Sequence, residues 1–156
     1  MIQVIGSIFA GTGKAGDFGW MIRQPEYADA LFVFNDNEEQ FRAHRQDPQG
    51  SYGCSAGGGN AIIRPYQCQS PPQAIGIPTG SKGHGYTALT AEVRQTIDDA
   101  IGTIQELLAT GRYRRLFYSA ANAAGDLGTG IFEVHPDVKY HITEQLRALG
   151  PQSSTA

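Results

Sequence analysis

The chain has 156 residues, of which 40% are hydrophobic and 17% are charged. This length and this apolar fraction suffice for one compact domain with its own core, which excludes an unstructured chain and two full-sized domains. The formal net charge of −3 argues against nucleic acid as the main partner, because proteins that track a phosphate backbone carry a basic surplus.

The sequence lacks the patterns of membrane and secreted proteins. No apolar run reaches the length of a spanning helix, and no basic residue precedes the N-terminal apolar stretch. We therefore expect a cytoplasmic protein with no membrane partner. Cys54 and Cys68 have no further cysteine and no histidine at zinc spacing beside them, so we expect two free thiols and no metal site.

The first half of the chain contains two predicted strands. Residues 2–10 form an apolar, β-branched run that ends in glycines, and residues 29–34 form an apolar run typical of a strand covered on both faces. Residues 38–45 fit a short polar helix. The rest of this half, residues 47–59, is expected to be loop, and a glycine-rich turn then leads into a short helix limited by Pro65.

The second half alternates strands with longer helices. Strands are predicted over residues 74–78 and 115–119. Between them, Thr90 is a plausible N-cap, apolar residues follow at helical spacing, and Gly111 is placed to end the helix. A last helix is predicted to begin near Pro136, which suits a first-turn position.

This alternation predicts an α/β protein with three layers, helices covering both faces of a mostly parallel sheet. Residues 1–150 are expected to form a single domain. The small polar residues 151–156 are expected to be a flexible tail.

Glycines concentrate where predicted strands end or a helix begins. In parallel sheets, ligands bind at the carboxyl ends of the strands, where free N–H groups of helix N-termini favour anions. Four segments contain three glycines each, namely Gly11, Gly13 and Gly16; Gly57, Gly58 and Gly59; Gly80, Gly83 and Gly85; and Gly125, Gly128 and Gly130. Together they predict a cradle of backbone N–H groups for a diphosphate.

The first glycine segment has the GxGxxG pattern directly after a strand. Asp36 ends the second strand, where the ribose-binding acid of a dinucleotide fold would lie, so an NAD-binding, Rossmann-like protein is one alternative. Against it, the segment that should form the phosphate-binding helix contains a glycine and a proline. The segment does not fit a P-loop, because Ala15 follows Lys14 where a magnesium-binding Ser or Thr is required.

The order of the motifs resembles the macro domain, a family of ADP-ribose-binding α/β modules. Gly16-Asp17 is similar to the family's Gly-Asp-Ile stretch, and residues 28–37 look like its strand ending in Asn-Ala-Ala-Asn. Residues 57–62 resemble the glycine run that opens its next helix, and residues 128–134 resemble its Ser-Thr-Gly-Ile-Phe-Gly loop.

The resemblance implies a role for each matching segment. Asp17 would accept a hydrogen bond from the adenine amine, the run at residues 57–59 would approach the distal ribose, and residues 128–132 would wrap the diphosphate. With the first glycine loop, the expected ligand-binding residues are Gly11, Gly13, Asp17, Asn35, Gly57, Gly58, Gly59, Gly128, Thr129, Gly130, Ile131 and Phe132. No cofactor is expected.

Four functions remain open. The favoured one is a module that binds ADP-ribose or a related nucleotide, including a cyclic signalling nucleotide that it would sequester, as small phage-encoded proteins can do. The second is a hydrolase of ADP-ribosyl bonds or of ADP-ribose phosphate, with Asn37 and Asp36 as catalytic residues. The others are the NAD-binding protein and a structural protein whose glycine loops bind nothing.

Several basic side chains lie near the glycine loops. Arg23, Arg64 and Lys82 are candidate phosphate partners. His84 and His135 could contact a phosphate or act as acid or base, although a lone loop histidine is more often a solvated side chain.

Overall fold

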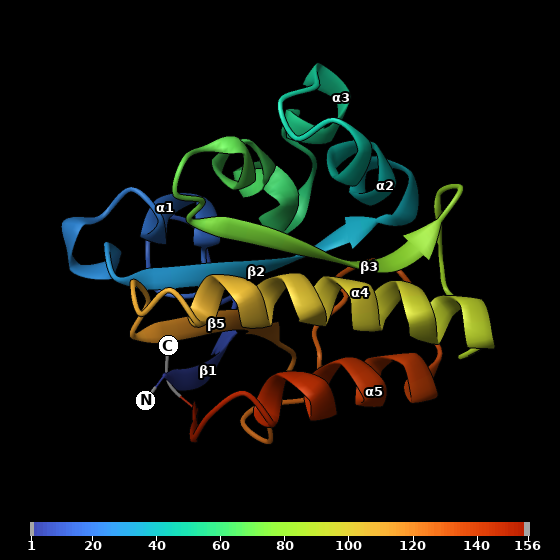
Figure 1. Ribbon diagram of the computed structural model, residues 1–156. Helices are drawn as coiled ribbons and strands as arrows, with labels where there is room; N and C mark the ends of the chain where they lie inside the picture. The colour runs from blue at the N-terminus through green and yellow to red at the C-terminus, as the bar shows by residue number, and fades with distance from the viewer. Residues whose placement is uncertain (1, 155–156) are drawn as a thin grey trace.

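The computed structural model describes residues 2–154, which build a six-stranded sheet with helices on both faces (Figure 1). The strand order is β4-β3-β2-β5-β1-β6, and β4 runs antiparallel to β3 whereas the other pairings are parallel. The strands are β1 (Gln3–Ile8), β2 (Ala30–Asn37), β3 (Ala74–Ser81), β4 (His84–Gly85), β5 (Arg115–Ala120) and β6 (Gln152–Ser154). The predicted α/β class with a mostly parallel sheet is confirmed.

The helices form layers on the two faces of the sheet. In Figure 1 the long helices α4 and α5 lie side by side below the sheet, and the short helical segments lie above it. The helices are α1 (Phe18–Met21), α2 (Glu38–Gln46), α3 (Ser51–Cys54), α4 (Ala91–Leu108) and α5 (Pro136–Arg147), with the 3₁₀ helices η1 (Pro25–Tyr27) and η2 (Gly59–Cys68).

The α4 helix shows how the sequence directs this packing. The Thr90 hydroxyl accepts a hydrogen bond from the Val93 N–H at 3.1 Å, so the predicted N-cap is confirmed. Ile97, Ile101 and Ile104 recur at helical spacing and are buried against the sheet. The α5 helix begins at Pro136, as predicted.

The opposite face of the sheet holds an aromatic core. The rings of Phe32 on β2 and Phe117 on β5 stack with their centroids 5.2 Å apart, and Phe18 of α1 packs edge-on against Phe32. Phe18 and Phe32 are fully buried. Burial of Phe18 holds α1 on the sheet, and burial of Ala61 and Ile63 in the same cluster holds η2. Segments this short are not stable helices by themselves.

The chain after α5 differs from the expected flexible tail. Residues 152–154 form β6, which pairs with β1, and the Val4 N–H donates to the Pro151 carbonyl at 2.7 Å. Pairing along a sheet edge uses backbone groups, so small polar residues satisfy it without an apolar pattern. Residues 155–156 of the expected tail lie outside the described residues.

The prediction of free thiols is wrong, because Cys54 and Cys68 form a disulfide. The bond joins α3 to the end of η2, which pack against each other. The segment expected to be loop contains α3, and Pro65 lies inside η2 instead of limiting it. These contacts depend on how the segment folds over β3, which the spacing of the cysteines does not reveal.

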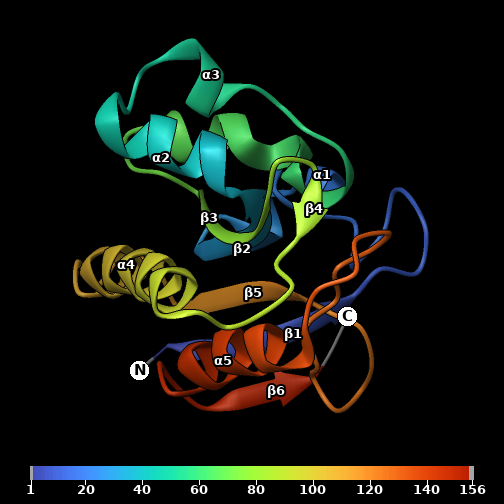
Figure 2. The same cartoon turned by 90° about the vertical axis from the view of Figure 1, so that its right-hand side faces the viewer.

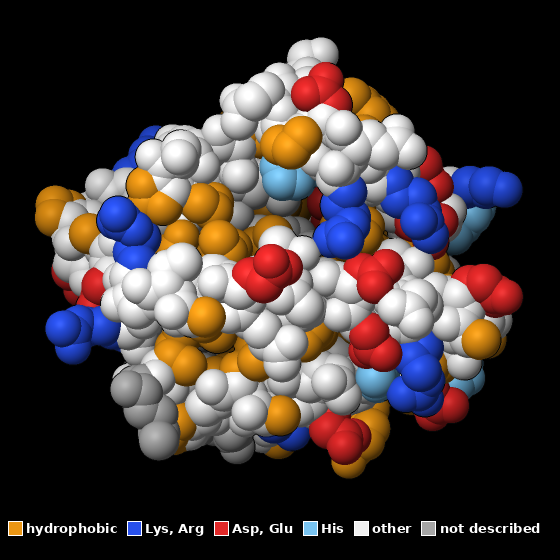
Figure 3. Space-filling view, viewed as in Figure 1, with side chains coloured by type: hydrophobic (Ala, Val, Ile, Leu, Met, Phe, Trp, Pro, Cys, Tyr) orange, Lys and Arg blue, Asp and Glu red, His pale blue; other side chains and the backbone are white. Residues whose placement is uncertain are grey.

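The surface over α4 and α5 carries charges of both signs. In Figure 3 basic and acidic side chains are interspersed on this face rather than gathered in one basic patch. Among the described residues, none of the helices combines the length and the apolar composition needed to cross a membrane.

Candidate functional site

Three of the glycine segments lie along the carboxyl edge of the sheet. Figure 2 shows the loop after β1, the start of η2 and the loop before α5 on the right-hand side of the molecule. The Phe18 N–H donates to the Asn60 side-chain oxygen at 3.3 Å, which joins the first of these segments to the second. The Asn35 side-chain amide donates to the Gly128 carbonyl at 2.6 Å, which ties the third to the end of β2.

The third segment is also close to the first. The Gly128 N–H donates to the Ser119 carbonyl at 2.9 Å, and Ser119 on β5 is the register partner of Ser7 on β1. The β1 strand ends one residue after Ser7 and leads into the first glycine loop. Segments far apart in the sequence therefore meet at one edge, as the parallel-sheet rule predicts.

Two of these segments present backbone N–H groups that no acceptor within residues 2–154 engages. At the start of η2, the N–H groups of Gly58 and Gly59 have no acceptor within the described part of the chain, which is usual for a first helical turn. The same holds for Thr129 and Gly130 in the loop before α5. Such groups attract anionic oxygen atoms.

The glycines of the run at residues 57–59 have different surroundings. A side chain at Gly57 would come within 2.7 Å of the Arg64 guanidinium, so the absence of a side chain here makes room for Arg64. A side chain at Gly58 would meet no atom within 4 Å, and Gly58 and Gly59 are exposed. Of the three predicted ligand residues, Gly58 and Gly59 are therefore the ones open to a ligand.

The first glycine loop is held together by Asp17. The Asp17 carboxylate accepts a hydrogen bond from the Gly13 N–H at 2.8 Å, and the Asp17 N–H donates to the Lys14 carbonyl at 3.0 Å. Gly11 lies beside the flexible end of the Lys14 side chain. Asp17 is half-buried, and its contact with an adenine amine stays a prediction.

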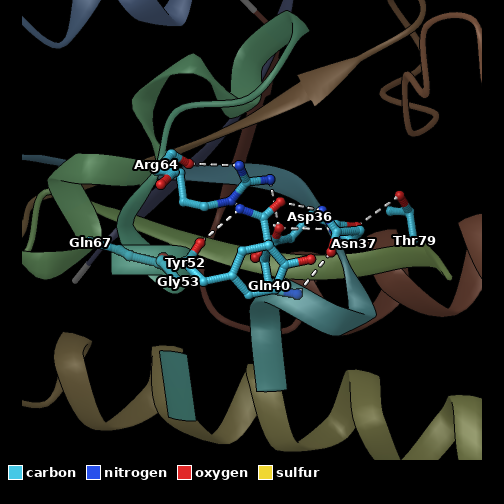
Figure 4. A network of polar contacts seen from close by, with 9 residues as sticks. Asp36, Asn37, Gln40, Tyr52, Gly53, Arg64, Gln67 and Thr79 are labelled. Atoms are coloured by element: carbon cyan, nitrogen blue, oxygen red, sulfur yellow. Dashed lines mark hydrogen bonds and ion pairs between the residues drawn. The ribbon is translucent and has the colours of Figure 1, made fainter. Parts of the chain in front are cut away.

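The residues predicted to be catalytic lie in a polar network beneath this edge (Figure 4). Asp36 is 4% exposed, and one carboxylate oxygen accepts from Arg64 Nε at 3.1 Å and from Arg64 Nη2 at 2.8 Å. Gly76 on β3 leaves space for the other oxygen, which has no hydrogen-bond partner among the described residues. Burial raises the pKa of Asp36 above its usual value, and the Arg64 guanidinium opposes this increase.

The Asn37 side chain also forms hydrogen bonds within the protein. Its side-chain oxygen accepts from the Gln40 N–H at 2.8 Å and caps α2, while its amide donates to the Gln40 side chain at 2.6 Å. Arg64, expected to be a phosphate partner, is buried and also donates to the Ser55 carbonyl at 2.8 Å. Apart from the unpartnered Asp36 oxygen, the three side chains thus direct their hydrogen bonds into the protein.

Ser7, which the structure places under this edge, was missed by sequence reasoning. Its side chain is fully buried, and its hydroxyl has no partner among the described residues. A serine within an apolar strand carries no periodic or motif signal. Exposed apolar side chains also surround the loops, with Phe9 55%, Phe132 50% and Ile131 96% exposed.

The two candidate histidines line a groove of about 650 Å³ between the β4 region and the loop before α5. His135 Nδ1 accepts from the Asp137 N–H at 3.0 Å and so caps α5. Tyr86, whose carbonyl accepts from the His135 N–H at 2.9 Å, donates its hydroxyl to the Glu38 carboxylate at 2.6 Å. Burial, together with this bond to Glu38, raises the Tyr86 pKa. His84 is exposed. Among the described residues, no cluster of His, Cys, Asp and Glu could hold a metal ion.

Comparison of the chain with protein-family models, with curated proteins and with solved structures finds no match. The strand order and pairing alone assign the chain to the α/β class with a mostly parallel sheet.

Replacing Asn35 with alanine tests the bond that positions the loop before α5. We expect the free energy of unfolding to fall by about 1 kcal/mol, because a half-buried carbonyl at Gly128 loses its donor. We also expect faster amide hydrogen exchange in residues 128–132. The control is Gln95→Ala, which removes an exposed hydrogen bond on α4; equal exchange in both variants would contradict the role of Asn35.

Proposed function

We propose that the protein binds ADP-ribose or a closely related nucleotide at the carboxyl edge of the sheet and holds it without chemical change. The observation that carries the proposal is the set of unused backbone N–H groups at Gly58, Gly59, Thr129 and Gly130. They belong to two segments that lie at the same edge. Such groups suit the oxygen atoms of a diphosphate.

The side chains around these groups favour a nucleotide over a simple anion. Phe9, Ile131 and Phe132 expose apolar surface next to the loops, and an aromatic ring can stack on a flat base. An inorganic phosphate would use the N–H groups but leave this apolar surface in water. A ligand with both a diphosphate and a base uses both features.

The resemblance to macro domains supports the same ligand class. The segments that carry it, residues 16–17, 57–62 and 128–134, are the segments that lie at this edge. In this reading Asp17 faces the adenine, and the loop at residues 128–132 wraps the diphosphate.

The polar network beneath the edge favours binding over hydrolysis. Asp36 is buried against Arg64, and Asn37 caps α2. The one Asp36 oxygen without a partner is itself buried, so neither side chain reaches the open edge where it could orient water against a bound ligand. The same burial weighs against an NAD-binding site, since Asp36 would have to reach a ribose hydroxyl. In addition, α1 has only four residues, too few for the phosphate-binding helix of that fold.

Gly58→Val tests the proposed binding site. The Gly58 backbone has φ −80° and open space around it, so valine fits without strain while its side chain covers the N–H groups at the start of η2. By calorimetry with ADP-ribose, AMP, NAD and cyclic ADP-ribose, we expect the best ligand to bind the variant about tenfold more weakly or worse, as for lost hydrogen bonds to a charged group.

Gly102→Ala, a change at an open position on α4, is the control and should leave the affinity unchanged. Chromatography of the ligand after binding should recover it intact. If none of the four nucleotides binds the unmodified protein, the proposal is wrong. If the ligand is returned cleaved, the protein is an enzyme rather than a binding module.

A further inference from the structure

The disulfide closes a covalent ring around part of the candidate site. Cys54 and Cys68 are 14 positions apart, and the chain between them contains the glycine run and Arg64. The ring therefore includes the N–H groups of Gly58 and Gly59 that the proposed ligand would use.

Few other contacts hold the exposed part of this ring. Between Cys54 and Gly59, the Ser55 carbonyl accepts from Arg64 at 2.8 Å and the Ser55 hydroxyl donates to Ser51. The Gly57 N–H donates to the Ala61 carbonyl at 3.0 Å, and the Ala61 N–H donates to the Gly58 carbonyl at 3.1 Å. Ser55 and Gly58 are exposed, so this stretch has little apolar burial of its own. Glycine-rich segments lose much conformational entropy when they become ordered, and a cross-link reduces that loss.

The remainder of the fold does not depend on the ring in the same way. The α4 and α5 helices pack on the opposite face of the sheet through a separate apolar cluster. The aromatic core around Phe32 includes Ala61 and Ile63 of the ring but neither cysteine, so apolar burial holds η2 on the sheet independently of the bond. Opening the disulfide should therefore loosen the glycine run and leave the sheet and its long helices in place.

We propose that the Cys54–Cys68 disulfide is a redox switch that controls nucleotide affinity, an inference that rests on the proposed function. In the switching reaction a dithiol reductant gives two electrons and two protons to the protein disulfide. The sulfur–sulfur bond breaks, Cys54 and Cys68 become thiols, and the reductant becomes a disulfide. Both cysteines are half-buried rather than enclosed, so a reductant can reach them.

The test compares three forms of the full chain: oxidised protein, protein reduced with excess dithiothreitol, and the double variant Cys54→Ser, Cys68→Ser. Calorimetry with ADP-ribose should give an affinity about tenfold lower for the last two forms, a coupling within the range known for regulatory sites. Hydrogen exchange should become faster in residues 55–59 and stay unchanged in α4. Mass spectrometry after alkylation establishes the thiol state of each sample.

The following results would contradict the proposed redox switch. Equal affinity in the three forms would overturn the switch, as would equal exchange in residues 55–59. Loss of protection in α4 on reduction would also overturn it, because the bond would then support the whole fold. If the oxidised protein does not bind ADP-ribose or the other nucleotides, the proposed function fails and the affinity switch with it, whereas the exchange data still report whether the bond orders the ring.

Discussion

Replacing Arg64 with methionine should lower the free energy of unfolding by about 3–5 kcal/mol, the range for breaking a buried ion pair. The change leaves the Asp36 carboxylate buried with no charged partner, since the Asp36 and Arg64 side chains are 0% and 3% exposed. It also removes the donor to the Ser55 carbonyl. Urea denaturation measures the loss.

Two further variants establish the cause. Arg42→Met removes an exposed pair with Glu38 on α2 and should cost less than about 1 kcal/mol. Adding Asp36→Leu to Arg64→Met should restore part of the lost stability, because no unpaired charge then remains buried. If the double variant is less stable than Arg64→Met, the loss of unfolding free energy comes from packing and not from the unpaired Asp36 carboxylate.

The same pair predicts a pH dependence. Because the folded-state pKa of Asp36 lies above its unfolded value, the contribution of Asp36 to stability is largest below the unfolded pKa and falls as the pH rises through the folded pKa. Removing Arg64 raises the folded pKa further. The destabilisation by Arg64→Met should therefore be smaller at about pH 4.5 than at about pH 8; a loss that is the same at both would contradict the assigned cause.

Replacing Gly16 with alanine should lower the free energy of unfolding by about 4 kcal/mol, through backbone strain and overpacking together. Gly16 has φ +99°, a region that side chains disfavour, and an added methyl group would overlap the carbonyl oxygen of Ile8. The obstacle is backbone at the end of β1, so it cannot turn away. Urea denaturation measures the loss of unfolding free energy, and amide hydrogen exchange should become faster in residues 9–17.

The matched control lies in the same loop. Gly13 also has a positive φ, +72°, but an added methyl group would meet nothing within 4 Å. Gly13→Ala should cost only the conformational strain, about 1 kcal/mol. Equal losses for the two variants would mean that the close approach to Ile8 is relieved by movement of the loop.

The long helices and the strands β1, β2, β3 and β5 could be predicted because their signals are local, whereas β4 and β6 carry no such signal. The spacing of Ile97, Ile101 and Ile104, with Thr90 as the cap, specifies α4 whatever surrounds it. The convergence of the glycine segments could also be anticipated, because carboxyl ends of parallel strands share one edge. The short segments α3 and η2 could not, because packing on the sheet and the disulfide hold them, and their own helical propensity does not.

In the candidate site, too, some features could be predicted from the sequence and others could not. That polar residues end β2 is visible in the run Asn35-Asp36-Asn37, but their roles are not. Asp36 was expected to face a ligand and instead pairs with Arg64, 28 residues away. The buried hydroxyl of Ser7 carries no sequence signal.

The amino-acid sequence by itself determined the class of the fold and the edge of the sheet where glycine loops gather, because strand and helix periodicity and turn chemistry act over a few neighbouring residues. Which glycines stay open, the joining of the two cysteines and the pairing of Asp36 with Arg64 depend instead on how the elements pack. Those outcomes depend on which distant groups share a dry interior, where an unpaired charge is costly and a side chain needs space that another residue must leave.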